Sequence, residues 1–434
     1  MLTIAPRPAT RGEGGRRPAE GLIAFLFAII ALTAAAADLP RSGFLGVQVR
    51  TDQNSVRVLS LIEGGSAKAA GIQQDDLITR INDHAATTSE DFVAFVRTLH
   101  AGDVATVHLL RGGEATTLQM TVKARPFEHA DDVDVIYGAV STSNGRRRVI
   151  ITAPKSTVPQ PAILYVNGIG CFSQESFDLS SNDTKLLYAL TRRGFITMRV
   201  EKSGVGDSEG PPCASTAADL QNEINGYMAG LKSLALNPLV DAKRLFIVGI
   251  SIGGVEAPLI ARAANVHGVV VINTVAKPFF EYLLDTRRRQ MELRHLSYDE
   301  IDAAMQVEER CNHHYLLERQ TMTGCRDQTT YPAPASYMQQ WAAQNPSANW
   351  KTIDAPVLIV YGTSDYVATN ADSPYLAKII NSFHPRQATV RAIGGMDHNM
   401  LRAGSMEESM NRTDPGEFDV QIVDVIGAWL AAHS

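Results

Sequence analysis

The chain has 434 residues, of which 45% are hydrophobic and 20% are charged, and its formal net charge is −6. This length suggests about two or three domains, and the apolar fraction is sufficient for ordinary globular cores. The acidic balance excludes a typical nucleic-acid binder, which presents a strongly basic face. The short basic run from Arg146 to Arg148 leads into an apolar stretch, and we interpret it as the solvated start of a strand.

The first 37 residues have the three-part layout of an export signal. Four arginines precede an apolar run from Leu22 to Leu32, and small residues that include Ala35 and Ala37 follow it. This order is typical of a secretory signal peptide with a cleavage site. The alternative is an uncleaved anchor over residues 21–37, a stretch at the short limit for spanning a bilayer. We therefore expect an exported protein that is periplasmic or extracellular, or anchored to the inner membrane by residues 21–37.

Residues 43–124 have the pattern of short strands with one helix. Apolar and polar residues alternate over 46–49, 56–59, 106–110 and 116–122, as they do in half-buried strands. The segment Arg111 to Glu114 is a hairpin turn signal between the last two strands. Helical apolar spacing runs from Ser89 to Leu99, with Ser89 as the expected N-cap. The pattern predicts a small β-rich α+β domain, and a linker around residues 125–128 follows it.

This first unit resembles a PDZ domain of the bacterial exported type. The resemblance is strongest from Gly65 to Ile78, which follows the family pattern S-x-A-x-x-A-G-L-x-x-G-D-x-I except that Asp75 replaces the usual glycine. In such domains a peptide adds to the sheet as a further strand, so a protein C-terminus is an expected partner. The loop whose backbone amides would capture the peptide carboxylate is formed by Gly43, Phe44, Leu45 and Gly46. The alternative is a PDZ fold that only packs against or positions its neighbour.

Residues 133–434 alternate buried strands with helices. Apolar runs typical of parallel strands occur at 162–166, 195–200, 244–248, 269–272, 356–360 and 388–393. Helices are expected over 183–193, 217–234, from the third strand to 264, and over 415–432. This order predicts an α/β domain with a mostly parallel sheet covered on both faces. The alternation stops over 276–350, which we interpret as a helical lid insertion above the strand ends, with simple decoration as the alternative.

A serine motif stands at the end of the third of these strands. Gly249-Ile250-Ser251-Ile252-Gly253 follows an apolar strand and opens a helix, which is the context that a G-x-S-x-G nucleophile elbow requires. The sharp turn exposes the hydroxyl group, and the helix N-terminus favours developing negative charge. We therefore predict that Ser251 is a catalytic nucleophile.

A serine hydroxyl needs a base, and the base needs an orienting group. Asp365 follows the strand at 356–360, and His398 follows the last strand after a glycine-rich lead. Both side chains should reach the same rim of the sheet as Ser251. His384 is expected on the opposite rim, and the pair at 313–314 lies in the insertion. We predict Ser251, Asp365 and His398 as the catalytic residues, and we expect no metal and no cofactor.

An oxyanion hole is needed because negative charge develops on the carbonyl oxygen. The strand at 162–166 runs into Asn167-Gly168-Ile169-Gly170-Cys171, and the backbone amides of Ile169 and Ile252 are the candidate donors, with that of Gly170 as second choice.

The second unit resembles the α/β-hydrolase superfamily over residues 133–434. Its order of serine, acid and histidine matches that family. Residues 199–208 are similar to the family's D-x-R-G-x-G-x-S loop, although Glu201 and Ser203 match only roughly, and Asn167 replaces the usual histidine. The resemblance implies acyl transfer: Ser251 attacks, an acyl-enzyme forms, and water hydrolyses it while His398 acts as base and then as acid.

Four cysteines in an exported protein suggest two disulfides, for which three pairings exist. Cys171 and Cys213 follow the ends of adjacent strands, so we favour this pair. Cys311 and Cys325 then close a short loop in the insertion.

The leading hypothesis is a serine hydrolase of an ester or thioester. An exopeptidase or amidase of the same fold is the first alternative; it would use a lid carboxylate such as Glu308 or Glu309 for a substrate amine. The second alternative is a PDZ-based binding scaffold with an inactive hydrolase domain. The expected substrate is a small-molecule ester or a short peptide, and no nucleic acid is expected.

Overall fold

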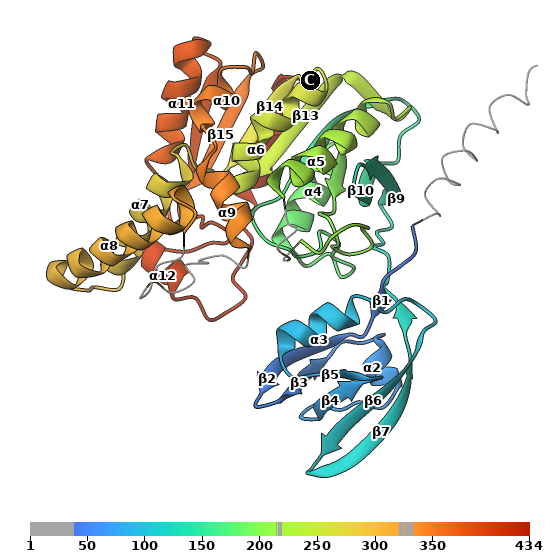
Figure 1. Ribbon diagram of the computed structural model, residues 1–434. Helices are drawn as coiled ribbons and strands as arrows, with labels where there is room; N and C mark the ends of the chain where they lie inside the picture. The colour runs from blue at the N-terminus through green and yellow to red at the C-terminus, as the bar shows by residue number, and fades with distance from the viewer. Residues whose placement is uncertain (1–38, 214, 216–218, 321–324, 326–332) are drawn as a thin grey trace, which may run out of the picture. The chain divides into compact units, whose positions relative to one another are not determined.

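The computed structural model describes residues 39–213, 215, 219–320, 325 and 333–434 (Figure 1). The expected export signal lies outside these residues. Within the described ranges, no helix combines the length and the apolar character that crossing a membrane requires.

Residues 43–124 form a six-stranded sheet, a short two-stranded sheet and two helices. In the larger sheet the order is β2-β3-β4-β6-β7, with β5 paired to β4, and β1 pairs with β8 in the smaller one. The strands are β1 (Gly43–Phe44), β2 (Val47–Asp52), β3 (Ser55–Leu61), β4 (Leu77–Ile81), β5 (His84–Ala85), β6 (Val104–Arg111), β7 (Glu114–Thr121) and β8 (Lys123–Ala124). The helices are α2 (Ser66–Ala69) and α3 (Ser89–Val96). The expected N-cap was wrong by one residue, because the Thr88 side chain accepts from the Asp91 amide and Ser89 is already helical.

Residues 133–434 are built on an eight-stranded mixed sheet. Its order is β16-β15-β14-β13-β11-β12-β10-β9, and the pairs from β12 to β16 are parallel. The strands are β9 (Val133–Thr142), β10 (Gly145–Pro154), β11 (Gln160–Val166), β12 (Ile196–Val200), β13 (Val240–Ile250), β14 (Gly268–Ile272), β15 (Val357–Gly362) and β16 (Ala388–Ile393). The antiparallel hairpin of β9 and β10 extends one edge, so the sheet is mostly parallel, as expected.

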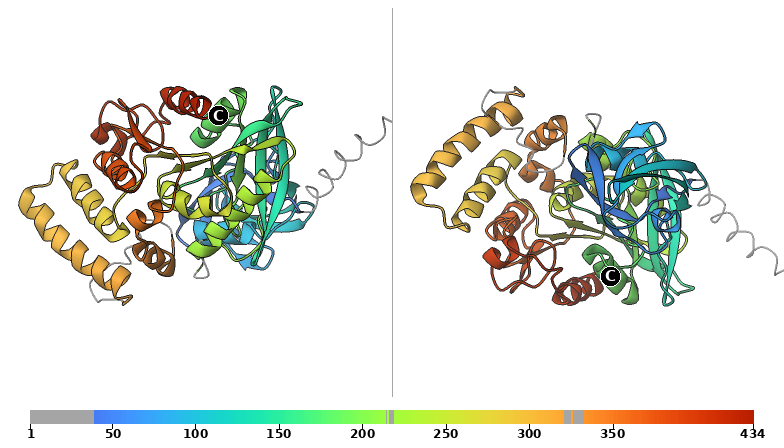
Figure 2. Two further views of the ribbon diagram at one scale, coloured as in Figure 1. Left: turned by 90° about the horizontal axis from the view of Figure 1, so that it is seen from above. Right: turned by 90° about the horizontal axis from the view of Figure 1, so that it is seen from below.

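Helices cover both faces of this sheet (Figure 2). Alternate strand residues point to opposite faces: Leu164 and Val166 pack on one side, Ile163 and Tyr165 on the other. The first face is covered by α5 (Leu220–Ala235), α6 (Ile252–Ile260) and α11 (Asp372–Phe383), and the second by α4 (Asn182–Arg192) and α13 (Gln421–Ala432). The last helix begins six residues later than expected, because the segment before it pairs back through a bridge from Phe418 to Leu401.

The expected insertion lies between β14 and β15, and its described residues are mainly helical. It contains α7 (Phe279–Glu292), α8 (Tyr298–Asn312), a π-helical turn η2 (His313–Leu317), α9 (Ala335–Ala342) and α10 (Pro346–Trp350). A capping box of Ser297 and Glu300 starts α8. Helix α7 is tied to the segment after β15, because Thr286 and Arg289 both donate to the Val367 carbonyl oxygen.

The basic run over residues 146–148 lies inside β10, and two of its three arginines are buried, so its interpretation as a solvated strand start was wrong. Arg147 and Arg148 are 1% and 2% exposed. Arg148 pairs with Asp207 at 3.0 Å and donates to the Gly138 carbonyl oxygen, while Arg147 donates to the Glu209 carbonyl oxygen. Strand β9 supplies Gly138 and the loop after β12 supplies Asp207 and Glu209, and nothing in the local sequence pattern reveals these acceptors.

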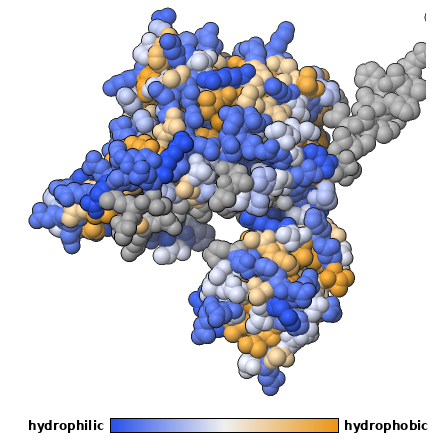
Figure 3. Space-filling view, in the orientation of Figure 1, coloured by the Kyte–Doolittle hydropathy of each residue, from blue (hydrophilic) through white to orange (hydrophobic). Residues whose placement is uncertain are grey.

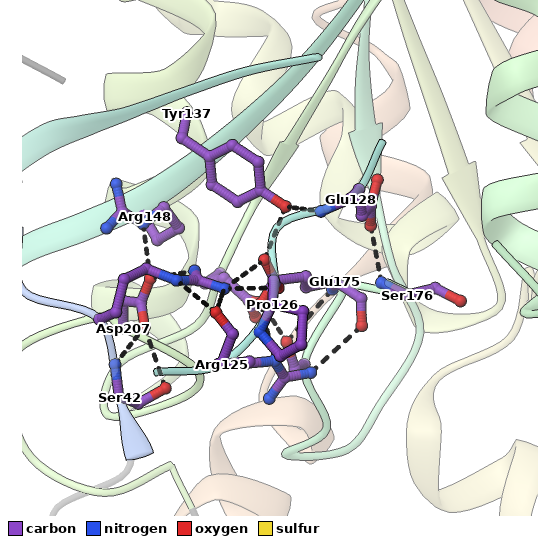
Figure 4. Close-up of polar contacts among 12 residues, drawn as sticks. Ser42, Arg125, Pro126, Glu128, Tyr137, Arg148, Glu175, Ser176 and Asp207 are labelled. Carbon is purple, nitrogen blue, oxygen red and sulfur yellow. Dashed lines mark hydrogen bonds and ion pairs between the residues drawn. The ribbon is translucent and has the colours of Figure 1, made fainter. Parts of the chain in front are cut away.

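The segments on both sides of residues 43–124 are anchored to the larger domain by charged contacts (Figure 4). Arg41 pairs with Glu175 at 2.8 Å and with Asp207 at 2.5 Å, and Arg125 pairs with Glu175 at 2.7 Å. The Ser42 amide and hydroxyl both donate to Asp207. The expected linker therefore belongs structurally to the larger domain.

One further linker residue is part of the core. Glu128 forms two hydrogen bonds of 2.7 Å with Arg199 of β12, and both side chains are 0% exposed. Tyr188 also donates to this carboxylate, as does the Ser176 amide. Such a buried pair is tolerated because the charges are matched and the remaining oxygen lone pairs are occupied.

Candidate active site

Ser251 lies in the sharp turn between β13 and α6. Its backbone has φ +54° and ψ −125°, a region that costs energy for a residue with a side chain. The flanking glycines are required by contact: a Cβ atom at Gly249 would lie 2.5 Å from the Gly253 carbonyl oxygen, and one at Gly253 would lie 2.3 Å from that of Val166. The close approach of β13, α6 and the end of β11 thus holds the strained serine in place.

His398 and Asp365 lie beside Ser251 at the carboxyl ends of the strands. The His398 Nε2 atom is 3.1 Å from the Ser251 Oγ atom, and Nδ1 is 2.8 Å from an Asp365 carboxylate oxygen. Asp365 is buried, and its other oxygen accepts from the amides of Val367 and Ala368. The structure therefore brings the three predicted side chains into one hydrogen-bonded chain.

The pKa of His398 is set by two opposing effects. Burial disfavours the charged imidazolium, but the charge of Asp365 and its hydrogen bond outweigh this and raise the pKa above its ordinary value of 6.5. A histidine of this kind can take a proton from a serine hydroxyl and hold it near neutral pH.

Two polar residues after β14 support this site and were not found from the sequence. The buried Asn273 side chain donates to the carbonyl oxygens of Asp397 and His398 and accepts from the Gly362 amide. Thr274 donates to the Ser251 carbonyl oxygen at 2.8 Å. The only signal in the sequence is a polar pair directly after a buried strand.

The candidate oxyanion segment follows β11 and lies against the nucleophile. A Cβ atom at Gly168 would be 3.3 Å from the Ser251 Cβ atom. The carbonyl oxygen of Gly168 accepts from Lys202 at 2.9 Å, and Asn167 accepts from the Tyr227 hydroxyl. Asn167, which replaces the family's histidine, is thus a buried polar side chain that ties the start of this segment to α5. Of the candidate amide donors, Ile169 follows Gly168 in the chain and Ile252 follows Ser251. Gly170, the second choice, is the next residue after Ile169.

The loop after β12 supports the oxyanion segment. The Glu201 carboxylate accepts from the Ser173 hydroxyl at 2.5 Å and from the Gln174 amide. A disulfide between Cys171 and Cys213 joins the same two loops. The second disulfide joins Cys311 and Cys325, so both favoured pairings are present.

Glu308, His313 and His314 of the insertion are each paired with another residue of the insertion. Glu308 pairs with Arg287 at 3.0 Å, so this carboxylate is not left open for a substrate amine. His313 and His314 both pair with Glu318. Within the described ranges, no group of three or more metal-ligating side chains is placed to hold a metal ion.

Comparisons with known proteins agree with this architecture. Residues 43–122 match the model of the PDZ domain, and residues 163–417 match that of the alpha/beta hydrolase family. The chain is 24% identical over 284 residues to Esterase EstD of Thermotoga maritima, an alignment that covers 64% of each protein. The chain thus spans somewhat less than two thirds of that relative's length. It is 29% identical over 114 residues to the "Probable periplasmic serine endoprotease DegP-like" of Pseudomonas putida, covering 26% of this chain and 23% of that one.

Among solved structures, Est1E of Butyrivibrio proteoclasticus is similar with a TM-score of 0.44 and 13% identity, covering 68% of this chain and 98% of that one. The family model extends over more than half of the 434 residues, from the buried strand β11 to the segment before α13. The chain therefore belongs to the alpha/beta hydrolase family and carries a PDZ domain ahead of its hydrolase domain.

Proposed function

We propose that the protein is a serine hydrolase that cleaves an ester through an acyl-enzyme on Ser251. The observation that carries this proposal is the hydrogen-bonded chain from Ser251 through His398 to Asp365. A strained serine with a base at 3.1 Å and a buried carboxylate behind that base is the arrangement that activates a hydroxyl group.

The reaction would proceed in two halves. The Ser251 oxygen attacks the substrate carbonyl carbon while His398 Nε2 accepts the hydroxyl proton, and the backbone amides of Ile169 and Ile252 stabilise the negative oxygen. The imidazolium then gives its proton to the leaving alcohol as the carbon–oxygen bond breaks. In the second half, water loses a proton to His398 and attacks the acyl-enzyme. The imidazolium then returns this proton to the Ser251 Oγ atom as the acyl bond to Ser251 breaks and the acid is released. Asp365 stabilises the imidazolium in both halves.

An ester is the first choice of substrate because a relative aligned over 284 residues is named an esterase. Thioesters and amides react by the same chemistry, so thioesterase and exopeptidase activities stay as alternatives. Of the two lid carboxylates expected to serve the exopeptidase alternative, Glu308 is paired with Arg287, whereas Glu309 is exposed.

Labelling with a fluorophosphonate probe tests the proposal directly. The wild-type protein should be labelled, and Ser251→Ala should not. Asp365→Asn and His398→Ala should be labelled far more slowly, and p-nitrophenyl esters of rising chain length should be hydrolysed faster than matched anilides. Absence of labelling in the wild type and in a lid-deleted form would contradict the proposal and favour the scaffold alternative.

We also propose that the PDZ domain binds a protein C-terminus. Strand β2 lies at the edge of its sheet, and α3 contacts it. Apolar side chains reach the surface of this domain (Figure 3), among them Val93 of α3, which is 39% exposed. An exposed strand edge beside a helix suits the addition of a peptide strand.

The loop before β2 supports carboxylate capture. The carbonyl oxygens of Phe44, Leu45 and Gly46 accept from Ser66, Ala67 and Ile62, respectively. In a trans peptide unit the N–H group points away from the C=O group, so the next three amides point away from these partners. Those amides, from Leu45 to Val47, are suited to bind a carboxylate.

Fluorescence anisotropy with short peptides tests this docking role. Peptides with an apolar last residue and a free carboxylate should bind, and the same peptides with an amidated end should not. Equal binding of both forms, or of neither, would favour a domain that only positions its neighbour.

Export is proposed from the sequence of residues 1–37, and the similarity to a protein named a probable periplasmic serine endoprotease supports it. Cell fractionation of the full chain, with and without residues 1–37, tests the location.

A further inference from the structure

Lys202 contacts the candidate oxyanion segment. Its side chain is almost fully buried, and its ammonium group donates to the carbonyl oxygen of Gly168 at 2.9 Å. The same group forms an ion pair with Glu223 of α5 at 2.5 Å. A buried lysine needs a counter-charge and acceptors, and this one has both.

The acceptor of Lys202 belongs to the same peptide unit as a candidate catalytic amide. The carbonyl of Gly168 and the N–H of Ile169 share one planar trans peptide, so they point in opposite directions. Lys202 therefore fixes the direction in which the Ile169 N–H points. A charged donor on the carbonyl side also polarises the peptide, which makes its N–H a stronger donor.

A hydrogen bond from the insertion supports the ion pair between Lys202 and Glu223. The Tyr337 hydroxyl, from α9, donates to the second oxygen of Glu223 at 2.8 Å. Tyr227, also from α5, donates to the side chain of Asn167, the residue before Gly168. A path of direct contacts therefore runs from α9 through Glu223 and Lys202 to the peptide that follows β11.

We propose that Lys202, held by Glu223, is a positioning residue that sets the oxyanion hole by orienting the Gly168–Ile169 peptide. The proposal rests on the proposed function, because it needs Ser251 to be the nucleophile. It assigns Lys202 no proton transfer and no contact with substrate. Its effect should appear in the transition state, where the negative oxygen forms, and not in substrate binding.

The test is steady-state kinetics of Lys202→Met, Lys202→Arg and Glu223→Gln on the best ester found for the wild type. Loss of one oxyanion donor costs about 10²–10³ in kcat, and misdirection of a donor should cost part of that, about 10–100-fold. We expect Lys202→Met to lower kcat by this factor while KM stays nearly unchanged. Lys202→Arg should recover part of the loss, because it keeps a charged donor.

A boronic acid that forms a tetrahedral adduct with serine provides a second readout. Its affinity should fall in Lys202→Met by the same factor as kcat, whereas affinity for the product acid should not change. Lys277→Met is the matched control. Lys277 also pairs with two carboxylates, those of Asp285 and Glu281, and all three residues lie in the insertion. This control should keep both kcat and adduct affinity.

Unchanged kcat and adduct affinity in Lys202→Met would overturn the inference, as would equal losses in kcat and in product affinity. If Lys202→Met does not fold, the kinetics of Lys202→Arg and Glu223→Gln provide the test. A kcat equal to that of the wild type in both of these variants would overturn the inference. Failure of the proposed function is distinguishable, because then the wild type would not be labelled at Ser251. Labelling at Ser251 together with an unaffected Lys202→Met would reject only the positioning role.

Discussion

The side-chain amide of Asn273 donates to the main-chain carbonyl oxygen of His398 at 3.1 Å. The same amide donates to the carbonyl oxygen of Asp397, and its oxygen accepts from the amide of Gly362, the last residue of β15. Asp365 follows that strand by three residues. One buried side chain at the end of β14 therefore joins the segment that carries the candidate base to the segment that carries its acid.

Asn273→Ala should lower kcat by about 10–100-fold, because a displacement of about 1 Å in a catalytic group can cost 10²-fold. KM should change little, since Asn273 lies behind the site. Kinetics on the best ester checks this, with Asn381→Ala as control. Asn381 also bridges main-chain groups, those of Ala388, but at the opposite end of β16. Equal kcat losses in the two variants would show that Asn273 matters only for stability.

The pH dependence of kcat/KM should reveal the raised pKa of His398. Only the neutral imidazole accepts the Ser251 proton, so activity falls as pH drops through this pKa. Burial lowers the pKa, but Asp365 raises it above 6.5, so the midpoint of the acid limb should lie above that value. In Asp365→Asn the midpoint should move to lower pH, along with a loss of rate. A midpoint that stays fixed in this variant would show that Asp365 does not set the pKa.

The sequence was sufficient to place the three candidate catalytic residues because each follows a recognisable strand. Ser251 lies in a glycine motif whose spacing is dictated by contacts in the turn, and His398 follows a glycine-rich lead. The order of strands and helices likewise predicted the parallel part of the sheet and the insertion, but not strand β9 at its antiparallel edge.

The sequence did not indicate the residues that support the site. Lys202 and Asn273 contact main-chain groups in the segments that follow other strands, so no local spacing marks them. The burial of Arg148 and Glu128 was missed for the same reason, because their partners Asp207 and Arg199 are far away in the chain. Charged residues are usually exposed, and only the folded arrangement shows which ones are paired.

Glu256→Gln should stabilise the protein increasingly as pH rises. Glu256 lies on α6, is 0% exposed, and its carboxyl oxygens have no hydrogen-bond partner among the described residues. Burial, and then the charge of Glu223, raise its pKa well above 4.5. In the unfolded chain the group ionises near pH 4.3, so above this pH the unfolded state loses a proton that the folded state keeps. The free energy of unfolding therefore falls as pH rises towards the raised pKa.

Glutamine has the shape of the protonated acid but cannot ionise, so this loss should be absent in Glu256→Gln. The two proteins should have similar Tm values near pH 4, and the variant should have the higher Tm near pH 8, as measured by calorimetry. A difference in Tm that is constant over this range would show that Glu256 is not protonated in the folded protein.

Breaking the buried pair of Glu128 and Arg199 should be strongly destabilising. Arg199→Met leaves a carboxylate without its counter-charge at 0% exposure, and removal of one partner of such a pair costs about 3–5 kcal/mol. The double variant with Glu128→Leu should recover much of this free energy of unfolding, because apolar replacement of both partners is often neutral. Urea denaturation measures both changes.

The surface pair of Arg192 and Asp132 provides the comparison. Both side chains are about half exposed, and Arg192→Met should change the free energy of unfolding by about 1 kcal/mol or less. A similarly small effect of Arg199→Met would mean that water reaches Glu128 and that the linker is not anchored in the core. A large effect, relieved in the double variant, would establish that the segment joining the PDZ domain to the hydrolase domain is held by this pair.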